Sequence, residues 1–104
     1  MSTFKDRERA FESKFAHDQE MVFKAVARRN KKLGLWAAGL MGKTAAEAEA
    51  YAMEVIRADF EEAGHEDVVR KIVADLDGHA DEAQIRAKMD ELLMQSKSEL
   101  LDED

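Results

Sequence analysis

Residues 42–47 read Gly-Lys-Thr-Ala-Ala-Glu, and this stretch ends one predicted helix and begins the next. Gly42 favours the left-handed backbone that terminates helices, and the cation of Lys43 is favoured beside a carbonyl end. Thr44 and Glu47 have the spacing of a capping box, in which each side chain accepts a hydrogen bond from the other residue's backbone amide. The stretch therefore predicts two helices joined by a tight turn.

Apolar residues that recur every three, four or seven positions predict four helices beyond the N-terminal segment. The first runs from about Asp18 to Met41, the second from the box to about Ala63, and the third from Glu66 to Leu76. A second box-like pattern at residues 81–84 begins the last helix. The residues expected to face inward include Val22, Val26, Leu33, Trp36, Ala37, Leu40, Ala48, Ala52, Val55, Ile56 and Phe60. The short connections predict an all-α fold, a four-helix bundle over residues 18–104.

Composition excludes several classes of protein. The chain of 104 residues has no Pro and no Cys, so a disulfide framework and thiol catalysis are excluded, and a reducing cytoplasm is expected. No apolar run approaches the roughly 20 residues that span a bilayer, and the charged start lacks the apolar region of a signal peptide. Direct membrane insertion is therefore not expected. We also expect no enzyme and no metal site, because a phosphate-binding loop, a nucleophile elbow and closely spaced histidines are all missing.

The net charge of −7 is unevenly distributed. Residues 1–43 contain ten Lys/Arg and five Asp/Glu, whereas residues 44–104 contain six and eighteen. The acidic part disfavours binding to nucleic acid. The basic part favours an acidic protein surface or a bound phosphate, and charge alone does not choose between these two.

Residues 1–17 form a charged segment that carries three phenylalanines. Phe4, Phe11, Phe15, Val22 and Val26 are spaced by 7, 4, 7 and 4, which predicts one stripe that extends the first helix. Burying three Phe contributes roughly 5–9 kcal/mol, and ordering fifteen residues costs about 15–30 kcal/mol before hydrogen bonds are counted. We therefore expect a flexible or conditionally helical segment. It either folds onto its own bundle or becomes ordered in a groove of a partner protein.

A basic block follows in the first helix. Arg28, Arg29, Asn30, Lys31 and Lys32 precede Trp36 by about one turn. One interpretation is that these side chains hold the phosphates of a nucleotide while Trp36 stacks on its base. The other is that they form a solvated helix face, with Trp36 in the core.

Two long blocks carry a resemblance to a known family. Residues 4–18 read Phe-Lys-Asp-Arg-Glu-Arg-Ala-Phe-Glu-Ser-Lys-Phe-Ala-His-Asp, and residues 23–38 read Phe-Lys-Ala-Val-Ala-Arg-Arg-Asn-Lys-Lys-Leu-Gly-Leu-Trp-Ala-Ala. In this order and spacing they resemble the ATPase inhibitor zeta subunit of alphaproteobacteria, a regulator of the F-type ATP synthase. In length and helix layout the resemblance extends over the whole chain.

This resemblance implies a function that composition does not reveal. Residues 1–17 would enter a catalytic interface in the catalytic head of the F-type ATP synthase and block ATP hydrolysis, with residues 18–104 as an anchor. The chain would then lie in the cytoplasm, peripheral to the inner membrane. The contact residues implied are Phe4, Lys5, Arg7, Glu8, Phe11, Phe15 and His17. A pH-dependent grip through His17 and ordinary packing or solvation of that residue both remain open.

The resemblance also implies ADP or ATP as a regulatory ligand, to be sought at the basic block. The alternative function is therefore a nucleotide-responsive binding module that acts as a sensor, and the two functions are compatible. A nucleic-acid binder is disfavoured by the net charge and by the absence of a recognised motif.

Overall fold

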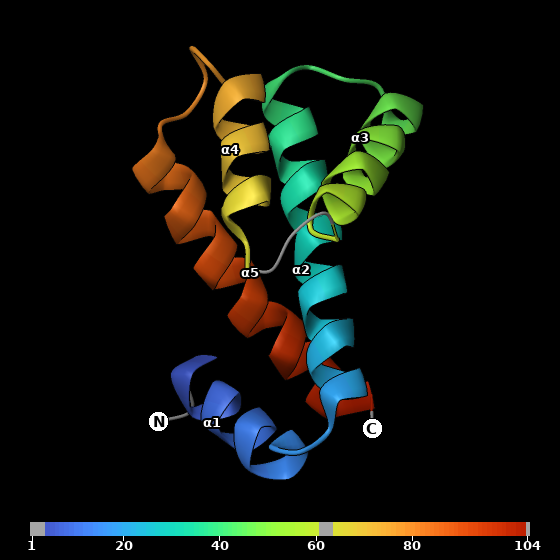
Figure 1. Cartoon of the computed structure of the whole chain (residues 1–104), viewed down its shortest axis with the longest axis vertical. Coiled ribbons are helices and arrows are strands. Elements are labelled where there is room, and N and C mark those ends of the chain that lie inside the picture. Colours follow the sequence, from blue (N-terminus) through green and yellow to red (C-terminus); the bar gives the residue numbers. More distant parts are fainter. Residues whose placement is uncertain (1–3, 61–63, 104) are drawn as a thin grey trace.

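The computed structural model describes residues 4–60 and 64–103, without the side chain of Phe4. This part of the chain contains five helices and no strand: α1 (Phe4–Phe15), α2 (Gln19–Leu40), α3 (Ala45–Ala58), α4 (Glu66–Asp75) and α5 (Glu82–Glu103). In Figure 1, α1 lies across the end of the molecule where α2 begins and α5 ends. The all-helical prediction is confirmed for the described residues. The regular geometry of a four-helix bundle stays a prediction.

The helix boundaries follow from the local signals in the sequence. At the start of α3, Glu47 N donates to Thr44 Oγ1 over 3.2 Å, and Thr44 N donates to Glu47 Oε1 over 2.9 Å. Gly42 has a φ of +74°, as a glycine after a helix end often does. Before α5, Asp81 and Gln84 exchange the corresponding hydrogen bonds over 2.8 and 2.9 Å. Both predicted capping boxes are confirmed.

Replacement of Thr44 by alanine is expected to lower the free energy of unfolding by about 1 kcal/mol, because one amide of the first turn loses its acceptor. For a domain of this size, the melting temperature should fall by about 4–8 °C. Thermal unfolding followed by circular dichroism measures this change. Thr44→Ser keeps the hydroxyl and serves as the control, so equal destabilisation in both variants would contradict the capping role.

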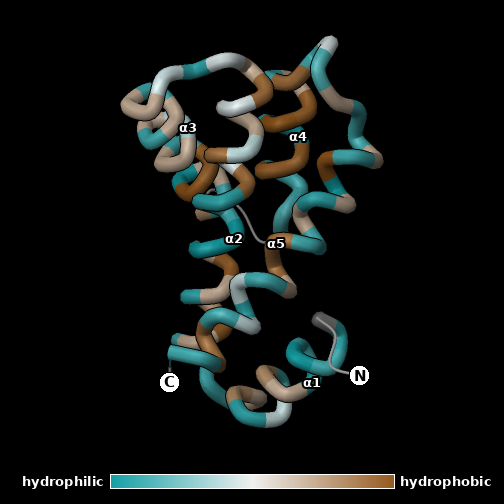
Figure 2. The backbone as a smooth tube through the Cα atoms, turned by 180° about the vertical axis from the view of Figure 1, so that it is seen from behind, coloured by the Kyte–Doolittle hydropathy of each residue, from teal (hydrophilic) through white to brown (hydrophobic). Residues whose placement is uncertain are grey.

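Four helices surround the main core. It is built from side chains of α2, α3, α4, α5 and the turn after α4, and the hydrophobic colour of Figure 2 is strong on α4. Gly34 of α2 lies so close to α3 that an added Cβ would stand 2.7 Å from Ala52 Cα. The buried members are Leu33, Ala37, Ala38, Tyr51, Val55, Val68, Val69, Ile72, Leu76, Ile85 and Met89.

A second, smaller core lies under α1. Its buried residues are Phe11 and Phe15 of α1, Ala25 of α2 and Leu100 of α5. The partly buried residues packed around them are Met21, Leu93 and Leu101. None of these residues belongs to the main core. Helix α1 contacts α5 far more extensively than it contacts α2.

The prediction that one apolar stripe extends the first helix is wrong. Asp18 adopts an extended backbone (φ −100°, ψ 91°), and its carboxylate caps α2 by accepting a hydrogen bond from Met21 N over 3.1 Å. The chain turns before this cap and folds α1 back onto α5. Phe11 and Phe15 therefore become buried, while Val22 remains 44% exposed. Whether the order of α1 depends on a partner stays a prediction.

Two further expectations of inward-facing residues are wrong. Phe60 is 62% exposed because α3 ends at Ala58, and its ring lies against the exposed ring of Phe23 with 5.6 Å between the centroids. The end predicted for this helix, Ala63, lies outside the described residues. Leu40 is also exposed, because the main core takes Ala37 and Ala38 at this end of α2 instead.

Candidate functional site

The phenylalanine face of α1 is covered by the chain's own α5. Phe11 is 1% exposed and Phe15 is 7% exposed, and their tilted rings lie 4.9 Å apart between centroids. Lys97 of α5 places its Nζ 5.7 Å from the centre of the Phe11 ring. The side chain of Phe4, the third predicted contact, lies outside the described part.

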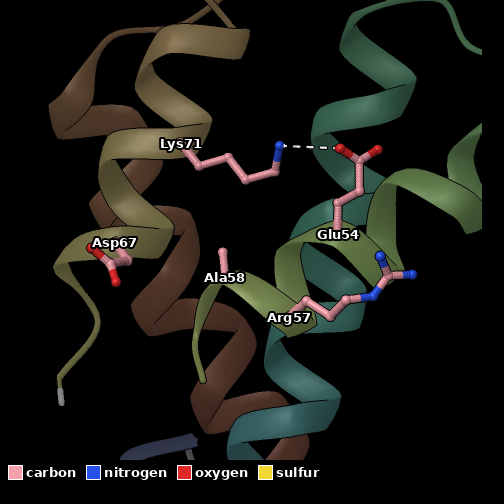
Figure 3. A pocket seen from close by; sticks show the side chains of 5 residues that line it. All are labelled: Glu54, Arg57, Ala58, Asp67 and Lys71. Atoms are coloured by element: carbon pink, nitrogen blue, oxygen red, sulfur yellow. Dashed lines mark hydrogen bonds and ion pairs between the residues drawn. The ribbon is translucent and has the colours of Figure 1, made fainter. Parts of the chain in front are cut away.

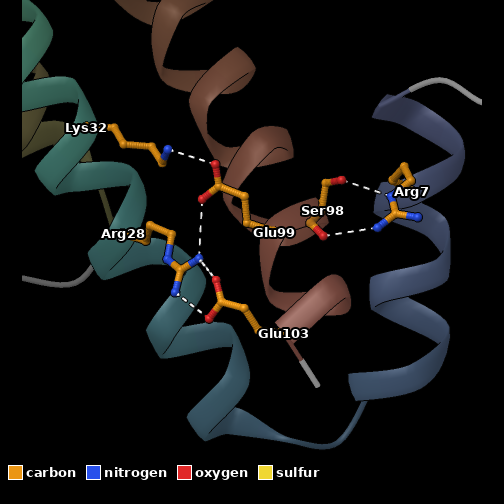
Figure 4. A network of polar contacts seen from close by, with 6 residues as sticks. All are labelled: Arg7, Arg28, Lys32, Ser98, Glu99 and Glu103. Atoms are coloured by element: carbon orange, nitrogen blue, oxygen red, sulfur yellow. Dashed lines mark hydrogen bonds and ion pairs between the residues drawn. The ribbon is translucent and has the colours of Figure 1, made fainter.

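Charged residues of α1 flank this apolar face and also reach α5. Arg7 donates from Nε to Ser98 Oγ over 2.9 Å and from Nη2 to Ser98 O over 3.1 Å, and it pairs with Asp102. Lys97 Nζ lies 3.6 Å from Glu8 Oε1 and 3.3 Å from Glu12 Oε1. Figure 4 shows Arg7 and Ser98 facing each other across the two helices. The structure therefore brings Arg7, Glu8, Phe11 and Phe15 onto one surface.

Two predicted contact residues lie away from this surface. Lys5 and His17 are both exposed. His17 lies in the short turn between α1 and α2, where it lines a shallow hollow with Lys14 and Asp18. These two side chains are accessible while α1 is packed against α5.

Two residues of the basic block also face α5, Arg28 and Lys32. Arg28 Nη2 donates to Glu103 Oε1 over 2.9 Å, and Lys32 Nζ donates to Glu99 Oε2 over 2.9 Å (Figure 4). The hydrogen bond with Glu103 raises the pKa of Arg28, and the same bond lowers the pKa of Glu103. These contacts connect α2 to the acidic end of α5.

Arg29 and Asn30 lie on another side of α2 and are buried. Arg29 Nε donates to Asn30 Oδ1 and Asn30 Nδ2 donates to Asp59 Oδ2, each over 2.9 Å. Arg29 Nη2 also lies 3.0 Å from His65 Nδ1. Burial lowers the pKa of Arg29, and the carboxylates of Asp59 and Asp90 offset only part of this shift. Arg29 and Asn30 thus join α2 to His65 and Asp59, which lie at the two ends of the α3–α4 connection.

The remaining two predicted nucleotide contacts lie apart. Lys31 is exposed, whereas Trp36 packs partly buried against the main core, with Lys88 Nζ 5.8 Å from its ring centre. The six residues therefore do not converge on one open site. A phosphate group at Arg28 and Lys32 would have to replace the carboxylates of Glu99 and Glu103. Nucleotide binding at this block stays a prediction.

Comparison with known proteins identifies the family. A solved structure, determined by solution NMR, is 58% identical, covers 81% of this chain and 99% of its own, and superposes with a TM-score of 0.74. No curated protein matches. The model of the family ATPase inhibitor subunit zeta matches residues 1–99. The chain belongs to this family. The resemblance inferred from the sequence is therefore confirmed, and the family's role is regulatory rather than catalytic.

The residues of this zeta-family chain that hold α1 were not predicted from the sequence. Lys97, Ser98 and Asp102 all lie on α5, about ninety positions from their partners on α1. No local sequence pattern predicts a contact between residues so far apart in the sequence. The opposite net charges of the two halves of the chain agree with the pair of Arg7 and Asp102, but Lys97 pairs in the opposite sense with Glu8 and Glu12.

Other features of the zeta-family chain do not form a site. A groove of about 360 Å³ between α3 and α4 is lined by Glu54, Arg57, Ala58, Asp67 and Lys71. Figure 3 shows Lys71 reaching towards Glu54, while Arg57 extends away from α4, so the charged groups do not converge.

The described residues also include no group of three or more His, Cys, Asp or Glu that could hold a metal ion. Within the same part of the chain, none of the helices combines the length and the apolar character needed to cross a bilayer.

Proposed function

We propose that this chain inhibits ATP hydrolysis by the F-type ATP synthase, by inserting residues 1–17 at a catalytic interface in the catalytic head of that enzyme. Membership in the family of ATPase inhibitor subunit zeta supports the inhibitory role. The observation that carries the choice of segment is the small core of α1, which is separate from the main core. Residues 18–104 act as the anchor.

The chemistry of α1 suits a groove between two protein subunits. Phe11 and Phe15 form its apolar face, and Arg7 and Glu8 flank that face with both signs of charge. An amphipathic helix of this kind binds by placing its apolar face in a groove, with charged pairs along the rim. A helix wedged between subunits that must open and close stabilises one closed state and stops the catalytic cycle. Bound in this way, the chain would lie at the membrane through its partner.

Deletion of residues 1–17 is expected to weaken inhibition strongly. The measurement is the rate of ATP hydrolysis by the purified catalytic head, titrated with the full chain or with residues 18–104. Buried aromatic and Arg residues commonly dominate binding energy, so the concentration for half inhibition should rise at least about tenfold. Circular dichroism of residues 18–104 checks that the main core remains folded.

Met53→Ser is the control for this deletion, because Met53 is exposed on α3 and remote from the small core. This variant should inhibit as the full chain does. Equal inhibition by the full chain and by residues 18–104 would remove the inhibitory role from the N-terminal segment.

A further inference from the structure

The proposed function requires the apolar face of α1 to contact a partner, but in the isolated chain this face is covered by α5. Phe11 and Phe15 are buried against α5, and Arg7 is bonded to Ser98. They cannot enter a groove on another protein while these contacts persist. Resting on the proposed function, we propose that α5 is a latch that stores α1 in a closed, non-inhibiting state and releases it before the segment reaches the synthase.

Lys97 is at the centre of this latch. Its side chain is only 12% exposed, it lies over the Phe11 ring, and its Nζ faces the carboxylates of Glu8 and Glu12. An ammonium group above an aromatic face is attracted to that face, and partial burial strengthens its ion pairs. One side chain of α5 therefore contacts both the apolar face and the acidic edge of α1.

A second contact fixes the other edge of α1. The Arg7 guanidinium donates to the hydroxyl and the carbonyl of Ser98 and pairs with Asp102. In the first ion pair the cation is Arg7 of α1, and in the second it is Lys97 of α5. Each helix therefore contributes both a cation and an anion to the interface. This arrangement defines one register for the docked helix.

The architecture allows α1 to open while the rest of the fold is retained. The small core shares no residue with the main core, and helix α1 makes only limited contact with α2. The connection between α1 and α2 is a short turn over residues 16–18, and α2 has its own cap in Asp18. Opening therefore exposes Phe11, Phe15 and Leu100 and leaves the main core intact.

The latch makes a quantitative prediction. When the closed state dominates, the apparent affinity for a partner is reduced in proportion to the fraction of open molecules. A change on α5 that weakens the latch must then speed hydrogen exchange in α1 and lower the half-inhibiting concentration by the same factor. Lys97 lies outside the inserting segment. A substitution at Lys97 therefore changes how firmly α5 holds α1 and leaves the residues that would contact the synthase unchanged.

The decisive variant is Lys97→Met, which keeps an unbranched apolar stem and removes the charge. Amide hydrogen exchange in α1 should accelerate about threefold to tenfold, whereas exchange in α2, α3 and α4 should not change. Inhibition of the catalytic head should require a concentration lower by the same factor. Lys88→Met is the matched control, because Lys88 also lies on α5 over an aromatic ring, that of Trp36, and pairs with Glu91.

Asp102→Asn removes the exposed partner of Arg7 and should shift both measurements in the same direction by a smaller factor. Unchanged exchange in α1 for Lys97→Met and Asp102→Asn would overturn the latch. Faster exchange with weaker inhibition would also overturn it, because α5 would then contact the synthase directly. If neither the full chain nor Lys97→Met inhibits at all, the proposed function fails, and exchange alone reports whether α5 holds α1.

Discussion

Replacement of Gly34 by alanine is expected to lower the free energy of unfolding by about 3 kcal/mol, at the upper end for an overpacked core. The new Cβ would lie 2.7 Å from Ala52 Cα and 3.3 Å from Val55 Cγ2. A backbone atom cannot rotate away, so relief requires α2 and α3 to separate, and these two helices pack together more extensively than any other pair in the described part of the chain. The melting temperature should fall by roughly 12–24 °C, which thermal and denaturant unfolding would measure.

Gly39→Ala provides the control in the same helix. An added Cβ at Gly39 meets no atom within 4 Å. Because alanine loses less backbone entropy than glycine on folding, this variant should be more stable by up to about 1 kcal/mol. Equal stabilities of the two variants would contradict the close approach of α2 and α3.

The starts of α2, α3 and α5 were predictable because their causes are local. Each capping box lies within four consecutive residues, and the hydrogen bonds of Thr44 and Asp81 join groups that are already neighbours in the sequence. The start of a helix near Asp18 belongs to the same class, since Asp is a preferred N-cap. Such signals need no knowledge of the tertiary fold.

The position of α1 was not predictable from the same signals. The spacing of 7, 4, 7 and 4 fits one continuous helix, and it equally fits two helices that each present an apolar face. The choice between them depends on Leu100 and Lys97, which lie beside Phe11 because the tertiary fold places α5 next to α2. A contact of this kind follows from packing, and periodicity does not encode it.

The basic block illustrates the same limit. Consecutive helical residues point about 100° apart, so five adjacent basic or polar side chains cannot share one face. Arg29 and Asn30 became buried because Asp59 supplies a carboxylate beside them, while Arg28 and Lys32 met the acidic end of α5. The charges of this block are evident from the sequence, whereas their partners depend on the tertiary fold.

Replacement of Phe11 by alanine is expected to release α1. Truncating a fully buried phenylalanine costs about 3–5 kcal/mol, and this ring lies at the centre of the small core. Hydrogen exchange in α1 should therefore approach the rate of an undocked segment. The unfolding transition of the main core should shift less than in Gly34→Ala, because Phe11 contributes nothing to that core. Exchange measured by mass spectrometry and thermal unfolding report the two effects separately.

Phe23→Ala is the matched control, because it removes the same ring from an exposed position on α2 and should leave exchange in α1 unchanged. The inhibition assay then shows whether a variant only releases α1 or also loses a contact with the partner.

Lys97→Met and Phe11→Ala both open α1, yet only the second removes a ring that the proposed function needs at the catalytic interface. We expect the first variant to inhibit at lower concentration and the second to lose at least about tenfold in potency. Full inhibition by Phe11→Ala would exclude Phe11 as a partner contact, and protected amides in α1 would contradict its place in the small core.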